Sequence, residues 1–334
     1  MLLEKVWKGA FMDTQSIRYF IELVKNMHFT KTAQQLYISQ QNLSQHIKKL
    51  EEYYDTPLFY RKPKLKLTPA GEALYESFQK IVLEEDNARL KIDDILCNNV
   101  GTMTIGASAY RGQFWIPRVF PEFIAKWPNV STKIVMERSA KMEQSLITGD
   151  LDFFVGIKAS DDSLLRVIPL MNDKVYLVMT KTLMRKYFGE DAEELISVYE
   201  KGTSLKPFKN VPFFRLFSNY RLREQVNLCF AEAGYTPKQV LEVSNIETML
   251  SFIPFHIAAF VCTGMRVPYL KETYPDTCFF PILLDNKFIY SSLSIVYHKD
   301  HYFPQYSLDF IKHLRAFFDE FNVKTDYEPN TMDK

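Results

Sequence analysis

The sequence has few cysteines and no pattern that would join them. Its four cysteines, Cys97, Cys229, Cys262 and Cys278, stand far apart in a chain of 334 residues, and none belongs to a CxxC pair. This spacing predicts neither a disulfide scaffold nor a zinc module. A chain that stays in the reducing cytoplasm is the simpler interpretation.

Long apolar runs are missing as well. No stretch is long enough to span a bilayer, and the opening MLLEKVWKGAF lacks the apolar centre of a signal peptide. We therefore expect no membrane partner. The first helical pattern begins near Met12, so residues 1–11 are expected to be a flexible start.

The sequence also lacks the short motifs of common enzymes. It has no GxSxG, HExxH, GxGxxG or P-loop, and no paired motif for nucleophilic catalysis. We expect no catalytic residues, no metal and no cofactor, hence a protein that is not an enzyme. With 334 residues, 47% of them hydrophobic, the chain has ample material for two or three cored domains.

Three short helices are predicted at the start of the chain. Apolar residues recur at helical spacing from Thr14 to Val24, and a second stripe follows from Phe29, with Thr30 as an expected N-cap. After a tight joint, Ser39 can cap a third helix. Its apolar positions are Leu43, Ile47 and Leu50. This pattern is typical of a helix-turn-helix.

The outward face of the third helix carries amides, a hydroxyl and ammonium groups. At about 100° per residue, Gln41, Gln45 and Lys48 lie opposite the apolar stripe. Asn42, Ser44 and Lys49 lie on its flanks. Gln and Asn can bond adenine bidentately and Lys can donate to guanine, so this face could read bases in a major groove. An exposed polar face that is only solvated is the alternative.

A basic segment follows the third helix. Arg61, Lys62, Lys64 and Lys66 alternate with proline and leucine, which predicts a short hairpin or wing. Although the whole chain has 41 basic and 40 acidic residues, residues 12–67 have nine bases and five acids, a local charge of 9 − 5 = +4. Phosphate contacts require such a face. Simple solvation of these lysines is the other interpretation.

Thr68 and Pro69 predict the start of a long helix, with Thr as N-cap and Pro at the first position. Apolar residues then recur at spacings of three and four, which predicts a seam for dimerisation with Glu85 as a polar, register-setting interruption. The expected dimerisation residues are Leu74, Phe78, Ile81, Ala88 and Ile92.

Beyond residue 98 the chain alternates between strand-like and helix-like segments. This alternation predicts α/β sheets with helices on both faces and a ligand crevice at the strand ends. A last helix is expected over Tyr306–Phe321, followed by a loose tail from Asn322.

Together these residues resemble the LysR-type family of bacterial transcriptional regulators. The similarity runs from Met12 to about Phe321 and is carried by FTKTAQQLYISQQNLSQHIKKLEE, PLFYRK, LTPAG, MTIGAS, GDLDFFVGI and CFAEAGYTPKQVLEVSNIETML. The resemblance implies an α/β fold with an N-terminal winged helix-turn-helix (12–67), a linker and dimerisation helix (68–98) and an effector domain of two periplasmic-binding-protein-like lobes (99–323). Residues 324–334 are expected to be flexible.

The resemblance assigns roles in DNA binding to residues at matching positions. Expected base contacts are Gln40, Gln41, Asn42, Ser44, Gln45 and Lys48. Expected phosphate contacts are Thr30, Lys31, Lys49, Arg61, Lys62, Lys64 and Lys66. Gln45 stands where the family often has Arg, so we expect a preference shifted from guanine toward adenine. Gln41 and Asn42 replace a common proline and small residue, and the wing is one residue shorter than usual.

For the effector domain, the resemblance implies a small molecule between the lobes. The matching positions are Ser108, Tyr110, Arg111, Arg138, Ser139, Phe217, Ser218, Asn219 and Asn245. Arginines and helix starts would suit an anionic effector. Arg111 and Arg138 could instead pair with nearby carboxylates. In the second lobe, Pro254, Phe255 and His256 replace a usual glycine-rich turn, and their bulk could narrow or fill the crevice.

The expected function is a cytoplasmic, DNA-binding transcriptional regulator that forms homodimers and homotetramers. Its expected partners are double-stranded promoter DNA, a small effector, a second copy of itself and RNA polymerase. Two alternatives remain open: an enzyme that acts on a metabolite and uses the helix-turn-helix as an adaptor, or a constitutive DNA binder without effector. His298 and His301 have the spacing of a metal pair but better fit a polar loop. Cys229 and Cys262 could form a redox switch but better fit buried positions.

Overall fold

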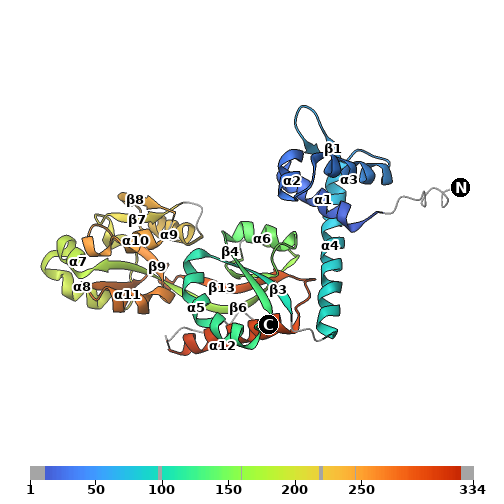
Figure 1. Ribbon diagram of the computed structural model, residues 1–334. Coiled ribbons are helices and arrows are strands. Elements are labelled where there is room, and N and C mark those ends of the chain that lie inside the picture. The colour runs from blue at the N-terminus through green and yellow to red at the C-terminus, as the bar shows by residue number, and fades with distance from the viewer. Residues whose placement is uncertain (1–11, 97–99, 159, 218–220, 245, 325–334) are drawn as a thin grey trace. The chain divides into compact units, whose positions relative to one another are not determined.

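The computed structural model describes residues 12–96, 100–158, 160–217, 221–244 and 246–324. Of the expected flexible ends, 1–11 and 324–334, residues 1–11 and 325–334 lie outside these ranges. The chain forms two compact units (Figure 1). The first contains Met1–Asn98 together with Ile147–Asp150 and Asp300–Pro304, and the second contains the rest.

Three helices open the first unit: α1 (Thr14–Asn26), α2 (Phe29–Gln35) and α3 (Gln40–Tyr53). Ser39 caps α3 as expected, because its side chain accepts a hydrogen bond from the N–H of Asn42. The expected cap of α2 was wrong. His28 is the N-cap and accepts from the N–H of Lys31, while Thr30 lies inside the helix.

The apolar faces of α1, α2 and α3 share one core. Ile17, Phe20, Leu43, Ile47 and Leu50 are all buried in it. Burial of such side chains contributes roughly 1.5–3 kcal/mol each, which makes the helical spacing of the apolar residues decisive for this small domain.

The wing forms next, as the antiparallel pair β1 (Phe59–Tyr60) and β2 (Lys66–Leu67). Thr68 then caps α4 (Pro69–Ile95), since its hydroxyl accepts from the N–H of Gly71 at 3.0 Å. A Cβ at Gly71 would come within 2.3 Å of the Leu58 carbonyl oxygen. Only glycine lets the start of α4 approach the wing this closely.

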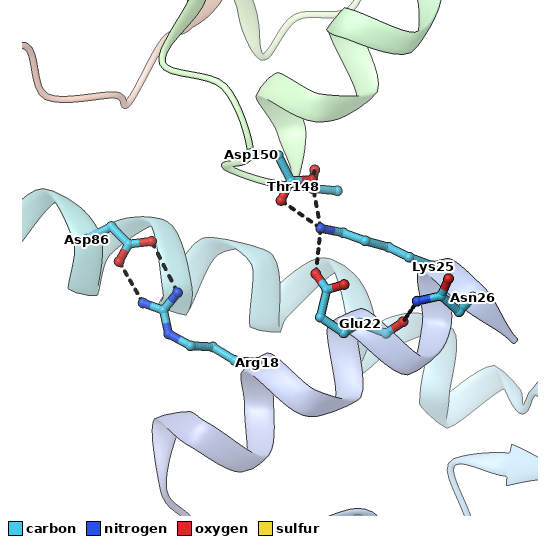
Figure 2. A network of polar contacts seen from close by, with 7 residues as sticks. All are labelled: Arg18, Glu22, Lys25, Asn26, Asp86, Thr148 and Asp150. Carbon is cyan, nitrogen blue, oxygen red and sulfur yellow. Dashed lines mark hydrogen bonds and ion pairs between the residues drawn. The ribbon is translucent and has the colours of Figure 1, made fainter. Parts of the chain in front are cut away.

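α4 is also fixed to α1 by ion pairs. Arg18 Nη2 lies 2.6 Å from Asp86 Oδ1 and 3.1 Å from Glu85 Oε2, and Figure 2 shows Arg18 reaching across to Asp86 on α4. In the same unit Lys25 Nζ lies between Glu22, at 2.9 Å, and Asp150, at 2.7 Å (Figure 2).

The second unit contains a seven-stranded mixed sheet that extends through two lobes. In the first lobe, β3 (Gly101–Ala107) pairs in parallel with β4 (Val130–Met136) and β5 (Phe153–Gly156). β13 (Tyr290–His298) runs antiparallel to β5 and to β6 (Leu165–Thr180), the long strand that continues into the second lobe. The helices of this lobe are α5 (Ala109–Lys126), α6 (Ser139–Ile147) and α12 (Gln305–Lys324).

Aromatic rings join α5 to α12, two helices of the first lobe that are labelled in Figure 1. The rings of Phe114 and Phe321 lie 5.0 Å apart, and Phe310 is within 6.4 Å of Trp115. The expected loose tail from Asn322 was wrong at its first residues. α12 continues to Lys324, and the buried Asn322 donates to the Leu170 carbonyl at 3.1 Å.

In the second lobe, the end of β6 pairs with β9 (Phe260–Thr263) and β10 (Thr277–Pro281), and β7 (Phe213–Leu216) pairs in parallel with β8 (Gln239–Val243). Between β10 and β13 in the sequence, the short strands β11 (Leu283–Leu284) and β12 (Lys287–Phe288) pair as a separate hairpin. The helices are α7 (Lys181–Phe188), α8 (Ala192–Tyr199), α9 (Arg221–Glu232), α10 (Ile246–Leu250) and α11 (Val267–Thr273), with 3-10 turns η1 (Gly189–Asp191), η2 (Lys206–Phe208), η3 (Ile253–Phe255) and η4 (Gly264–Arg266). The predicted α/β alternation holds, and the two lobes are confirmed.

Candidate DNA-reading helix and inter-lobe cluster

The predicted reading face of α3 is exposed. Gln40, Gln41, Asn42 and Gln45 are open to solvent at its first turns, and Ser44 is half-buried. Gln40 is also held in place, because its Oε1 accepts a hydrogen bond from the Thr30 hydroxyl of α2 at 2.9 Å. The amides therefore stand on a helix whose opposite face is locked into a core.

The ammonium groups of α3 are also exposed. Lys48 pairs with Glu52 at 3.3 Å, one turn further along the helix. Both side chains of this pair are more than half exposed, so the pair is weak. Lys31 and Lys49 are exposed as well.

Glu51 ties α3 to the wing. Its Oε1 accepts from the N–H of Leu58 at 2.9 Å, and its Oε2 lies 3.1 Å from Arg61 Nη2. The Arg61 guanidinium also lies 6.0 Å from the centre of the Phe29 ring. These contacts fix the base of the wing, whose other basic residues Lys62, Lys64 and Lys66 are exposed.

The predicted dimerisation seam of α4 divides into two groups. Phe78 is fully buried and Leu74 half-buried in the core formed with α1 and α3. Ile81, Ala88 and Ile92 are exposed, and so is Ile95 one turn beyond. Glu85 faces its own chain, with Oε1 2.9 Å from Arg89 and Oε2 3.1 Å from Arg18.

A cluster of polar side chains joins the two lobes at the start of α5. Arg266 of η4 is 8% exposed, and its Nη2 donates to the Tyr110 carbonyl at 3.3 Å and to Gln113 Oε1 at 3.0 Å. The same nitrogen donates to Glu247 Oε1 of α10, and the guanidinium lies 5.0 Å from the centre of the Tyr110 ring. Burial raises the pKa of the Tyr110 phenol, which keeps it protonated.

Arg111, expected to contact an effector, lies inside the protein. It is 5% exposed, and its Nη2 donates to the Ser291 carbonyl at 3.0 Å and hydroxyl at 2.7 Å. Its Nε is 3.8 Å from Asp173, a fully buried carboxyl that accepts from the N–H of Met265. Burial lowers the pKa of Arg111 and raises that of Asp173. The carboxylate partner considered from the sequence is therefore present.

The other predicted effector residues differ in how far they are exposed to solvent. Ser108 is half-buried at the N-cap of α5, where its side chain makes no capping hydrogen bond within the described part of the chain. Arg138 is exposed and Ser139 half-buried at the start of α6, and Phe217 is 42% exposed. Ser218, Asn219 and Asn245 lie outside the described residues. Sequence reasoning missed Arg266 and Glu247, because no helical or strand period marks them.

The bulky turn of the second lobe, Pro254 to His256, is not part of the hydrophobic core. Phe255 is 67% exposed, with its ring 6.1 Å from that of Phe252. His256 adopts a left-handed conformation (φ 52°), and its Nδ1 lies 3.0 Å from the Thr180 hydroxyl.

The remaining candidates are the cysteines, as a redox switch, and the histidines, as a metal pair. Cys229 and Cys262 are free and buried, as expected, and so is Cys278. Burial raises the pKa of Cys229 and Cys278 to about 11 and that of Cys262 further. His298 is buried and His301 packs on Phe303. Within the described ranges, no group of three or more His, Cys, Asp and Glu side chains could hold a metal ion, and no helix is both long and apolar enough to cross a bilayer.

Comparison with known proteins decides the family. Residues 14–72 match the family model for the bacterial regulatory helix-turn-helix protein of the lysR family, and residues 98–319 match that of the LysR substrate binding domain. The chain belongs to the LysR family. It is a LysR-type DNA-binding transcriptional regulator, and the family is one of regulators, not of enzymes.

Individual relatives agree with this assignment. The chain is 29% identical over 294 residues to the HTH-type transcriptional regulator YcgK of Bacillus subtilis strain 168, covering 83% of this chain and 90% of the relative. A full-length OxyR variant from Pseudomonas aeruginosa has a similar fold, with a TM-score of 0.67, 20% identity and coverage of 97% and 99%. Full-length CbnR solved with its target DNA has a TM-score of 0.53, 17% identity and coverage of 91% and 99%.

Proposed function

We propose that this LysR-type regulator reads promoter DNA with α3 and holds the duplex with its wing. The observation that carries the proposal is the exposed amide face of Gln40, Gln41, Asn42 and Gln45 on a helix whose other side is buried. Ser44 and Lys48 extend that face. The proposed phosphate contacts are Thr30, Lys31, Lys49, Arg61, Lys62, Lys64 and Lys66. Binding through such groups combines contacts to the bases with an electrostatic attraction to the phosphates, and this attraction weakens as the salt concentration rises.

Dimerisation through α4 is the second part of the proposal. The exposed residues Ile81, Ala88, Ile92 and Ile95 are spaced by seven, four and three, so they share one face of the helix. Such a stripe suits a helical seam with a second copy. Leu74 and Phe78, in the linker helix (proposed bounds 68–98), would support the seam from the side of α4 that packs on the core of the DNA-binding domain (proposed bounds 12–67). Two dimers would make the proposed tetramer, which would meet RNA polymerase at a promoter in the cytoplasm.

The effector part of the proposal places a small anionic molecule between the two lobes, at the start of α5. Arg266 is the proposed anchor, because a buried guanidinium is the preferred partner of a carboxylate. Ser108 and Tyr110 would line the same place, while Arg138, Ser139 and Phe217 are further proposed contacts. Arg111 would act by holding α5 to β13 rather than by touching the effector.

Glu247 suggests how such an effector would act. Its half-exposed carboxylate already binds the Arg266 guanidinium, which also holds Tyr110 and Gln113 of the other lobe. An anionic effector would compete with Glu247 for this guanidinium and favour one arrangement of the lobes. Regulation would then be a shift between populations, with no covalent chemistry.

A thermal-shift experiment with the full chain tests the effector proposal. Acetate and succinate are the probes, and a ligand that binds only the folded state raises the melting temperature. Glu247→Gln should enlarge the shift by releasing the guanidinium, and Arg266→Gln should abolish it. An equal shift in Arg266→Gln and wild type would contradict the anchor.

A further inference from the structure

Tyr37 lies at the joint between α2 and α3, and its side chain is almost completely exposed. Its exposed fraction is 96%, the highest among the large hydrophobic side chains in the described part of the chain. Aromatic rings usually stabilise proteins by burying a large apolar surface. The Tyr37 ring contributes almost nothing of this kind to its own domain.

The backbone at Tyr37 is nevertheless held firmly. The N–H of Tyr37 donates to the Gln34 carbonyl at 3.2 Å, and the N–H of Ile38 donates to the Ala33 carbonyl at 3.0 Å. This pair of bonds is the Schellman motif that ends many helices. Ile38 then packs against the same core in which Ala33 is buried. The motif therefore fixes the point from which the Tyr37 side chain leaves the chain.

The conformation of Tyr37 is one that favours glycine. Its φ of 55° is left-handed. Glycine is the usual residue at this position of a Schellman motif and asparagine the next, because other side chains are strained there. Strain of this kind is concentrated at functional sites. Tyr37 thus combines a strained backbone with a ring that does not pack, which points to a role outside the fold.

Tyr37 also stands directly before the helix that is proposed to read bases. Ser39 caps α3 and Gln40 begins it. A fully extended chain spans at most about 3.6 Å per residue, so the Tyr37 backbone lies within about 11 Å of Gln40. The major groove is about 12 Å wide and is bordered by the two phosphate backbones. A side chain this close to Gln40 can therefore reach a phosphate when α3 occupies the groove.

We propose that Tyr37 is a further DNA contact, whose hydroxyl donates a hydrogen bond to a phosphate at the edge of the groove that α3 occupies. Tyrosine hydroxyls are among the groups that donate to DNA phosphates. Such a contact positions the reading helix but carries no sequence information. The inference rests on the proposed base reading by α3, and it adds a neutral phosphate contact to the cationic ones.

Fluorescence anisotropy of the full chain tests this contact, with DNA from upstream of the protein's own gene and with scrambled DNA, across a salt series. Tyr37→Phe removes only the hydroxyl and should weaken binding of both DNAs by the same factor, roughly three- to tenfold. Because the lost group is neutral, the dependence of affinity on salt should stay as in wild type. Lys64→Gln removes a proposed cationic contact of the wing and should instead reduce the salt slope by about one.

Tyr37→Gly tests whether the ring serves the fold or the DNA. It removes the ring and relieves the left-handed strain, so DNA affinity should fall at least as far as in Tyr37→Phe while the melting temperature stays level or rises. Tyr269→Phe is the matched control. It removes the hydroxyl of a 45% exposed tyrosine on α11 of the second lobe, and it should leave DNA binding unchanged.

The outcomes separate this contact from the base reading on which it rests. Equal binding of both DNAs by wild type would contradict the base reading, and with it this inference. Specific binding by wild type that is lost in Gln45→Ala but kept at wild-type affinity in both Tyr37 variants would overturn the Tyr37 contact alone. A loss confined to the upstream DNA, or a lower melting temperature in Tyr37→Gly, would also overturn it.

Discussion

The ring of Phe78 on α4 packs edge-on against the ring of Phe20 on α1, with the ring centres 5.3 Å apart. Both rings are fully buried. The first turns of the linker helix therefore belong to the core of the DNA-binding domain, and the helix carries a buried inner apolar group and an exposed outer one.

Phe78→Ala is expected to destabilise the DNA-binding domain by about 3–5 kcal/mol, because it removes a fully buried ring from a small core. Urea unfolding followed by circular dichroism measures this loss. Unchanged unfolding together with loss of the dimer would instead place Phe78 in the seam between copies.

Replacing Ile92 and Ile95 by Asp should dissociate the dimer and leave the fold of each copy intact. Both side chains are more than half exposed, so in a single copy the introduced carboxylates are solvated and leave the fold intact. In the proposed dimer they would face the carboxylates of the second copy across the seam and repel them. Sedimentation velocity measures the oligomer. The control is Glu76→Lys, on the far side of α4 at about 100° per residue. If the control dissociates equally, the outer group is not the seam.

The ion pairs of Glu85 predict a pH-dependent link between α1 and α4. Desolvation by partial burial raises its pKa, but the hydrogen bonds from Arg89 and Arg18 and their positive charges together outweigh this, so the pKa lies below its ordinary value of 4.5. The charged form therefore stabilises the folded state above that value, and this contribution is lost as the pH falls through the lowered pKa.

Glu85→Gln should accordingly lower the melting temperature at pH 7, and its difference from wild type should shrink as the pH falls below about 4.5. Differential scanning calorimetry across this range gives the comparison, with the exposed neighbour Glu84→Gln as control. A difference independent of pH would mean that the carboxylate charge is not the cause.

Gln45→Arg is expected to move base preference from adenine toward guanine at the contacted position. A bidentate side-chain pair discriminates against the wrong base by about 1–3 kcal/mol. Selection of binding sequences from a random DNA pool reveals the preference of each protein. Identical preferences would show that Gln45 does not contact a base.

The DNA-binding half of the fold follows closely from local sequence signals. The stripe of Leu43, Ile47 and Leu50 spans about two turns of helix. The Ser39 cap and the Thr68-Pro69 start each lie within one turn, and all three formed as predicted. The wing could be predicted from the alternation of basic with apolar residues alone, and it forms the pair β1 and β2.

The inter-lobe cluster depends on long-range contacts that no local pattern records. Arg266 meets Tyr110 and Gln113 from more than 150 positions away, and Arg111 meets Ser291 from 180 away. Arg111 sits at a family position for an effector contact, yet burial beside Asp173 gives it a carboxylate partner.

The central claim, that the α3 face reads bases, is tested most directly by fluorescence anisotropy. Wild type and Gln45→Ala are titrated with DNA from upstream of the protein's own gene and with scrambled DNA, across a salt series. We predict tighter binding of the upstream DNA by wild type, affinity that falls as salt rises, and loss of sequence preference in Gln45→Ala. An unchanged preference in Gln45→Ala, or equal binding of both DNAs by wild type, would contradict the claim.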